Sequence, residues 1–166
     1  DCPGSNDSVV ELANYNSPTQ YVVAGTLAEL ESVKADVEVM RGKAILLPVA
    51  GAFHSRMLRK TEQLFAMYLL KVDFNPLQIP LINNVMAAEI NTPAEIKLSL
   101  VSQTSSHIYW WASMEKMQDC DLFIEVGPND KFGKILKREW PEKPIISINT
   151  QADIDVLMEI IAKLEA

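Results

Sequence analysis

The chain has 166 residues, 48% of them hydrophobic, and a formal net charge of −7 at pH 7. This apolar content suffices for a sizeable core and excludes a disordered chain. The acidic balance is the opposite of what nucleic-acid-binding proteins carry, and no apolar run is long enough to span a membrane. We therefore expect a globular protein with neither nucleic acid nor a membrane as partner.

The two cysteines, Cys2 and Cys120, and the two histidines, His54 and His107, are widely separated in the sequence. A structural zinc site needs four such ligands at closer spacing, so no metal site is expected. Unpaired cysteines are typical of a reducing compartment, which predicts a cytoplasmic protein. Because the chain opens on Asp1 and not on methionine, and its first residues are polar, we expect a fragment of a longer protein without a signal peptide.

The chain begins with a predicted hairpin followed by a helix. Residues 9–13 and 20–24 are β-rich, and the turn chemistry of residues 14–19 predicts a six-residue connection between them. The sequence Thr26-Leu27-Ala28-Glu29 is a capping box, which predicts a helix that ends near Gly42.

From residue 43 onward, expected strands alternate with expected helices, which predicts a parallel α/β sheet. The strands are expected at 43–49, 81–85, 122–126 and 145–148, and the helices at 57–69, 93–103, 108–118, 132–138 and 153–164. The first of these strands contains the continuous apolar run Ile45-Leu46-Leu47, which is typical of a strand buried on both faces.

His54 lies where an expected strand turns into an expected helix, with Ser55 as the candidate helix cap. Such a junction places a side chain at the carboxyl end of a strand, where α/β folds build their sites. A histidine there suits general-base catalysis on a hydroxyl nucleophile, although the chain contains no G-x-S-x-G elbow. From the residues alone, a histidine with only a structural role in a turn or core is the more common alternative.

Three other polar features stand at expected strand ends or turns. They are Asn14 with Asn16, Gln103, and the run Gly127-Pro128-Asn129-Asp130. Turn formation would account for the asparagines and the glycine-proline run, and an exposed helix end would account for Gln103. The serines also have ordinary capping or turn explanations.

Taken in order, five segments resemble one protein family. They are Asn14–Gly25, Gly51–Met57, Pro80–Val85, Gln103–Trp110 and Glu125–Pro128. All five are similar to segments of the bacterial malonyl-CoA:acyl-carrier-protein transacylases, in the same order along the chain. The resemblance implies the C-terminal part of an α/β-hydrolase-like acyltransferase. Residues 49–166 would belong to its large subdomain, and residues 1–48 to part of a ferredoxin-like small subdomain.

The resemblance also implies a reaction, the transfer of malonyl from coenzyme A to the phosphopantetheine thiol of an acyl carrier protein in fatty acid biosynthesis. The family works through an acyl-serine and needs no cofactor of its own. His54 matches the catalytic base, and Gln103 matches the residue whose backbone carbonyl orients the histidine ring. Asn14 and Asn16 match asparagines near the pantetheine arm, and Phe53 matches a residue that accompanies malonyl selection.

The chain departs from the family pattern in several places. The serine elbow, the malonyl-binding arginine and the oxyanion-hole glutamine of the family precede the matched region, so the chain by itself is expected to be inactive. His107 replaces a proline, and Asn129-Asp130 replaces a Gly-Lys pair. Two alternatives stay open: an acyltransferase domain of a larger polyketide or fatty acid synthase, and a non-catalytic module that binds carrier proteins.

Basic side chains could attract both the acidic carrier protein and the phosphates of coenzyme A, despite the negative total charge. The candidates are Lys131, Lys134, Lys137, Arg56, Arg59 and Lys60.

Overall fold

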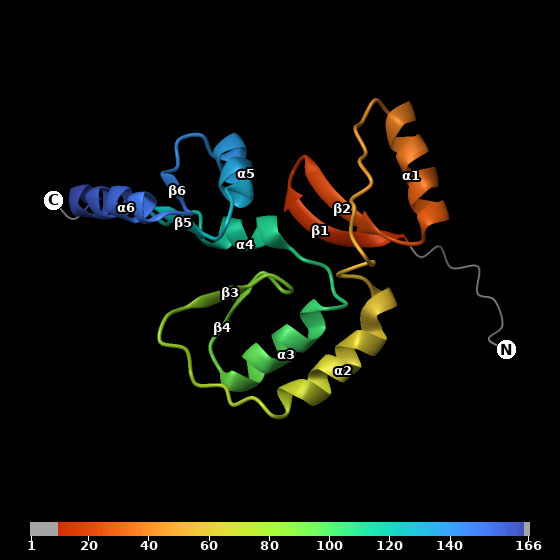
Figure 1. The fold of residues 1–166 in the computed structure, drawn as a ribbon, viewed down its shortest axis with the longest axis horizontal. Coiled ribbons are helices and arrows are strands. Elements are labelled where there is room, and N and C mark those ends of the chain that lie inside the picture. The colour runs from red at the N-terminus through yellow and green to blue at the C-terminus, as the bar shows by residue number, and fades with distance from the viewer. Residues whose placement is uncertain (1–9, 165–166) are drawn as a thin grey trace. The chain divides into compact units, whose positions relative to one another are not determined.

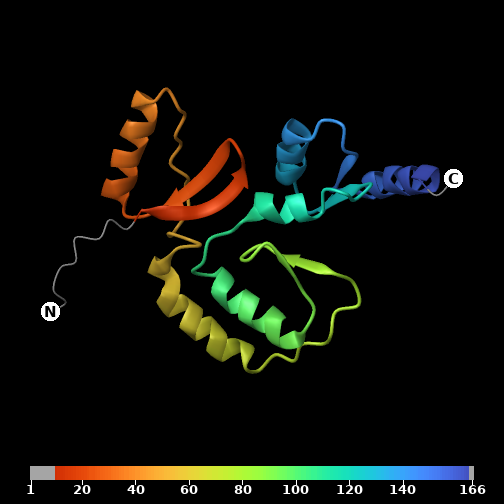
Figure 2. The same cartoon turned by 180° about the vertical axis from the view of Figure 1, so that it is seen from behind.

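The computed structural model describes residues 10–164, and the chain divides into two compact units, one ending at Lys116 and the other beginning at Met117 (Figure 1 and, from behind, Figure 2). Both units mix helices and strands, so the predicted α/β class is confirmed. The predicted boundary between residues 48 and 49 rests on the resemblance and stays a prediction. Cys2 and Val9 lie outside the described residues.

The first unit holds β1 (Glu11–Ser17), β2 (Gln20–Ala24), α1 (Leu27–Val39), the 3-10 turn η1 (Arg56–Leu58), α2 (Arg59–Leu69), β3 (Leu81–Asn83), β4 (Ala88–Ile90), α3 (Pro93–Gln103) and α4 (Trp110–Lys116). The second unit holds β5 (Phe123–Val126), α5 (Lys131–Glu139), β6 (Ile145–Ile148) and α6 (Gln151–Leu164). In these described residues, no helix is both long and apolar enough to cross a membrane.

The β1–β2 hairpin is tighter than the sequence predicts. β1 runs to Ser17, so that only Pro18 and Thr19 connect the strands, and the predicted turn at residues 14–19 is wrong. The Ser17 hydroxyl accepts a hydrogen bond from the Thr19 backbone N–H at 3.2 Å, which closes the turn. The strands pair antiparallel, with irregularities in register between Leu12 and Asn14 and between Tyr15 and Ser17.

The β3–β4 pair and the two helices α2 and α3 form the rest of the framework around the candidate site. β4 was not predicted, and it pairs antiparallel with β3. The buried Asn83 side chain holds the turn between them, because its Oδ1 accepts from the backbone N–H groups of Val85 and Met86 at 2.8 and 2.9 Å. Its Nδ2 donates to the hydroxyl of Ser99 on α3, which lies alongside α2 (Figure 1).

The predicted strand at residues 43–49 is not formed. This segment is irregular, and its apolar side chains at Ile45, Leu46 and Leu47 are exposed. A strand needs a neighbour for its backbone N–H and C=O groups, and none of the described strands pairs with this segment. The described strands form three two-stranded sheets, of which only β5–β6 is parallel, so a continuous parallel sheet from residue 43 is not seen in the described part of the chain.

The second unit is a β–α–β arrangement with an added helix. β5 and β6 pair in parallel, with Phe123 opposite Ile145, as their alternation with α5 predicts. The carboxylate of Glu125 accepts from the backbone N–H groups of Phe132 and Gly133, both at 3.0 Å, and from the Ser147 hydroxyl at 2.6 Å. One strand residue therefore joins β5, β6 and the first turn of α5.

Candidate active site

The turn that carries His54 has an unusual backbone. His54 has a φ of 61°, in the left-handed region that non-glycine residues seldom adopt. The following Ser55 is 1% exposed, and its hydroxyl accepts from the Met57 backbone N–H at 3.3 Å and donates to the Ala52 carbonyl at 2.7 Å. Ser55 is therefore the N-cap of η1, which confirms the capping role expected from the sequence.

The end of α3 faces this turn. The Nδ1 atom of His54 lies 2.8 Å from the backbone carbonyl oxygen of Gln103, and the His54 backbone N–H donates to the Thr104 carbonyl at 3.3 Å. The last carbonyls of a helix have no partner within the helix, so the Gln103 carbonyl is free to accept a bond from outside it. Because a carbonyl only accepts, Nδ1 must carry the hydrogen, and in the neutral ring the other nitrogen, Nε2, is left with a lone pair.

The structure thus brings together the two residues expected to be catalytic, and the ring is oriented by a carbonyl and not by a carboxylate. In this arrangement Nε2 can accept a proton, while the Nδ1–H bond to Gln103 stabilises the imidazolium that forms. Phe53, the expected acyl-selecting residue, precedes His54 directly and its side chain is exposed.

Asn14 and Asn16 lie within β1, away from the turn where the sequence placed them. β1 is tied to the segment after α3, because the Ile108 N–H donates to the Ala13 carbonyl and the Tyr15 N–H donates to the Ile108 carbonyl, both at 2.8 Å. His107 adds a bond from its Nδ1 to the Leu12 carbonyl. The asparagines and His54 are therefore connected through the segment that runs from residue 103 to 108. Within residues 10–164, neither asparagine forms a hydrogen bond with His54.

Two contacts at this site involve acidic residues that the sequence analysis did not single out. Glu11 accepts a hydrogen bond from the Arg56 backbone N–H at 2.6 Å, and Glu62 on α2 accepts one from the Ser105 hydroxyl. These partners lie 45 and 43 residues apart in the chain, so no local spacing could indicate them. The sequence predicts only a turn or capping role for Ser105. In the structure, Ser105 instead joins α2 to residues 103–108, the segment whose carbonyls bond to His54.

A cavity of about 350 Å³ in the first unit adjoins Gln103. Its polar lining consists mainly of Asn83, Asn84, Ser99 and Ser113. Asn83 donates to Ser99, and the Ser113 hydroxyl donates to the Asn83 and Tyr109 carbonyls, so Asn83, Ser99 and Ser113 serve the fold. Among residues 10–164, no three metal-binding side chains gather into a metal site.

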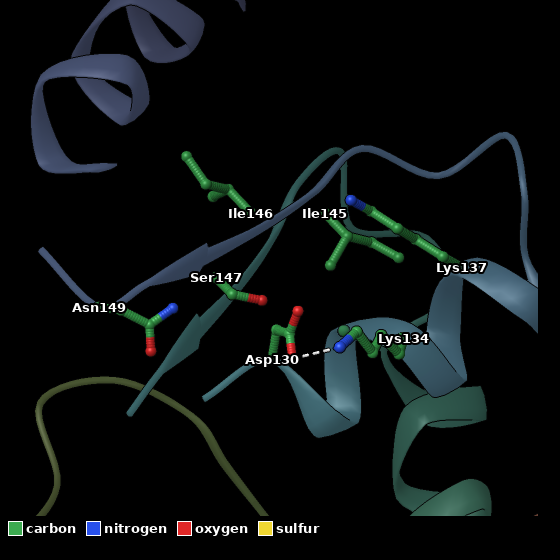
Figure 3. Close-up of a pocket in the computed structure, with 8 residues that line it drawn as sticks. Asp130, Lys134, Lys137, Ile145, Ile146, Ser147 and Asn149 are labelled. Atoms are coloured by element: carbon green, nitrogen blue, oxygen red, sulfur yellow. Dashed lines mark ion pairs between the residues drawn. The ribbon is translucent and has the colours of Figure 1, made fainter. Parts of the chain in front are cut away.

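A second pocket, of about 270 Å³, lies in the second unit between α5 and β6 (Figure 3). Lys134 and Lys137 of α5 line it together with Asp130, Ser147 and Asn149. The Lys134 ammonium lies 2.9 Å from the Asp130 carboxylate, and this contact holds the pKa of Asp130 below its ordinary 3.8. The pocket is therefore a polar surface with two lysines, both of which are exposed.

Comparison with known proteins identifies relatives over most of the chain. The malonyl CoA-acyl carrier protein transacylase of Synechocystis is 31% identical over 155 residues, which are 92% of this chain and 52% of the relative. The protein of the same name from Staphylococcus aureus (strain COL) is 29% identical and covers 90% of this chain and 50% of its own length. No protein-family model matches.

The fold agrees with these relatives. The crystal structure of malonyl CoA-acyl carrier protein transacylase from Clostridium perfringens superposes with a TM-score of 0.89 at 28% identity, over 95% of this chain and 51% of that one. The chain spans about half the length of the relatives that it matches. By sequence and by fold, the chain is therefore similar to one half of the malonyl CoA-acyl carrier protein transacylases.

Proposed function

We propose that this chain supplies the histidine half of the active site of an enzyme that transfers malonyl from coenzyme A to an acyl carrier protein in fatty acid biosynthesis. The 2.8 Å contact between His54 Nδ1 and the Gln103 carbonyl carries the proposal, because it leaves Nε2 as a base. The names of the relatives supply the substrates.

The proposed chemistry consists of two acyl transfers that share one base. His54 Nε2 takes the proton of a serine hydroxyl supplied from outside this chain, and the serine oxygen attacks the malonyl thioester. The thiolate of coenzyme A leaves and takes the proton back from Nε2. The carrier thiol then gives its proton to Nε2 and attacks the acyl-serine, and the serine oxygen recovers that proton as it leaves.

The remaining site residues would act on binding. Asn14 and Asn16 are proposed to face the pantetheine arm, and the exposed Phe53 to favour malonyl over bulkier acyl groups. The phosphopantetheine comes with the carrier, so the protein itself needs no cofactor. The chain by itself stays predicted to be inactive, and its cytoplasmic location also stays a prediction.

Lysines of α5 would draw the acidic carrier protein toward the enzyme. Lys134 and Lys137 are exposed at the pocket of Figure 3, with Lys131 one turn before Lys134 on α5. Arg56, Arg59 and Lys60 are exposed beside His54 and would act in the same way on coenzyme A phosphates. Lys137→Glu should reduce kcat/KM for the carrier, most at low salt, and an unchanged kcat/KM would contradict this part of the proposal.

The test joins this chain to the first half of the Synechocystis relative, giving a protein called here the joined enzyme. Malonyl transfer to a carrier protein is expected, and His54→Ala should lower it by about 10³-fold, the size of effect that loss of a catalytic base produces. Glu31→Ala, an exposed change on α1, is the matched control. Near-normal turnover by His54→Ala would refute the proposal.

The same assay separates the alternatives. A preference for methylmalonyl-CoA over malonyl-CoA in direct competition would favour an acyltransferase domain of a larger synthase. A folded joined enzyme that binds the carrier but forms no acyl-serine would favour a non-catalytic module.

A further inference from the structure

Glu11 makes a long-range contact with the turn that carries His54. Its Oε1 atom lies 2.6 Å from the backbone nitrogen of Arg56, which is the first residue of η1 and follows His54 by two positions. Hydrogen bonds from N–H groups to a carboxylate are shorter and stronger than neutral ones. The side chain of a hairpin strand therefore anchors the chain immediately after His54.

The turn has a specific need for this anchor. The Ser55 hydroxyl caps η1 by accepting from Met57, and the Arg56 N–H is a separate donor at the start of that turn. Glu11 satisfies this second donor. Without it, the left-handed backbone of His54, at a φ of 61°, would lose one of the contacts that hold it in a strained region.

Glu11 also completes a closed set of contacts. β1 forms backbone hydrogen bonds with Ile108. Ile108 ends the segment that begins at Gln103 and Thr104, and the carbonyls of those two residues bond to His54. The Glu11 side chain, on β1, accepts from the backbone N–H of Arg56 and so also holds the turn on the C-terminal side of His54. Movement of the hairpin relative to the end of α3 would thus change the position of the imidazole.

We propose that Glu11 is a positioning residue for His54, whose carboxylate holds the turn so that Nδ1 stays on the Gln103 carbonyl and Nε2 stays free. The catalytic meaning of this role rests on the proposed function, whereas the geometry does not. The proposal therefore predicts one effect on the ring that is measured without any substrate, and a second effect on turnover.

The first test uses the 166-residue chain labelled with ¹⁵N, with NMR of the His54 ring nitrogens and of the Arg56 amide. The wild-type ring should be mostly the Nδ1–H tautomer, and the Arg56 amide proton should shift as the Glu11 carboxylate is protonated in acid. Glu11→Ala should give a mixture of tautomers and move the Arg56 amide proton upfield. Glu11→Gln, which keeps an oxygen acceptor, should preserve the tautomer but remove the acid-induced shift.

Glu31→Ala, the exposed α1 change, is the control and should leave both signals as in the wild type. Unchanged His54 tautomer and Arg56 amide signals in Glu11→Ala would overturn the proposal. If Glu11→Ala does not fold, Glu11→Gln provides the test. An Arg56 amide proton that still shifts in acid in Glu11→Gln would also overturn the proposal.

The second test uses the joined enzyme. Glu11→Ala should lower kcat about tenfold with little change in KM for malonyl-CoA, and Glu11→Gln should recover most of the loss. A joined enzyme that is inactive with wild-type sequence would count against the proposed function and leave the NMR result standing. An active enzyme in which Glu11→Ala changes KM alone would count against positioning.

Discussion

The Nδ1 atom of His54 is 2.8 Å from the backbone carbonyl oxygen of Gln103, the last residue of α3. The acceptor is thus part of the main chain, at a helix end where carbonyls lack partners within the helix. Orientation of the ring therefore depends on where α3 ends and not on which side chain stands at position 103.

Gln103→Ala should accordingly keep the Nδ1–H tautomer of His54. Alanine retains the carbonyl and favours the helix at least as well as glutamine. Ring ¹⁵N shifts of the 166-residue chain would measure this, with Gln63→Ala on the exposed face of α2 as a matched amide deletion. If His54 showed a mixture of tautomers in Gln103→Ala but not in Gln63→Ala, the Gln103 side chain, and not its carbonyl, would determine the tautomer of the imidazole.

Asn83→Ala should destabilise the first unit. The Asn83 side chain accepts from Val85 and Met86 and donates to Ser99, and its removal takes a partner from two backbone N–H donors and from one hydroxyl acceptor. Such loss costs about 1–3 kcal/mol per buried group, so we expect the free energy of unfolding to fall by about 2–4 kcal/mol. Urea unfolding followed by circular dichroism measures it. Asn84→Ala, at the neighbouring amide, should cost less, and equal losses would contradict the assignment.

The capping box at the start of α3 predicts a pH-dependent stability. The backbone N–H groups of Thr92 and Asn91, together with the Thr92 hydroxyl, hold the pKa of Glu95 below its ordinary 4.5. The unfolded chain therefore takes up this proton at a higher pH than the folded chain. The contribution of Glu95 is fully present above about pH 4.5 and is lost as the pH falls through the lower folded pKa.

Glu95→Gln should thus lower the free energy of unfolding at neutral pH, and the difference from wild type should shrink in acid. Urea unfolding across this range tests the sign, and Glu31→Gln controls for the loss of one exposed helix charge. A difference that grows as the pH falls would show that the capping carboxylate is not the cause.

Gly133→Ala should destabilise the second unit. A Cβ at this position would lie 2.7 Å from the Ser147 hydroxyl and 2.9 Å from the Glu125 carboxylate, and these two groups are bonded to each other. Displacing them should cost about 1–3 kcal/mol, as overpacking typically does. Amide hydrogen exchange along β5 measures the loss. Gly127→Ala is the control, since its Cβ meets nothing within 4 Å, and an equal effect there would point to backbone flexibility instead.

Local signals predicted much of the fold. Both predicted capping boxes form, at Thr26–Glu29 and Thr92–Glu95. In each, the threonine hydroxyl and the glutamate carboxylate accept hydrogen bonds from the backbone N–H groups of the helix start. The strand expected at 145–148 has the bounds of β6. These elements depend on residues within one helical turn or one strand, which a sequence displays directly.

Contacts between residues far apart in the sequence explain most of the differences between the predicted and the observed elements. Ile45-Leu46-Leu47 has the composition of a buried strand, but a strand forms only where another strand accepts its hydrogen bonds. Asn14 and Asn16 have turn chemistry, yet pairing with β2 and the bridge to Ile108 keep them extended. For the site, the pairing of His54 with Gln103 came from family resemblance, whereas Glu11 joins the turn from 45 residues away and leaves no local pattern.

At His54, the strain of a left-handed backbone coincides with the side chain to which the proposed function assigns the role of base. Glycine adopts this region without a steric penalty, so His54→Gly would relieve strain of about 1–3 kcal/mol in the turn while it removes the imidazole. In a mutational scan of the joined enzyme, glycine at position 54 would rank well for cellular abundance and, under the proposed function, among the worst for malonyl transfer. A search for stabilising substitutions would thus discard the histidine.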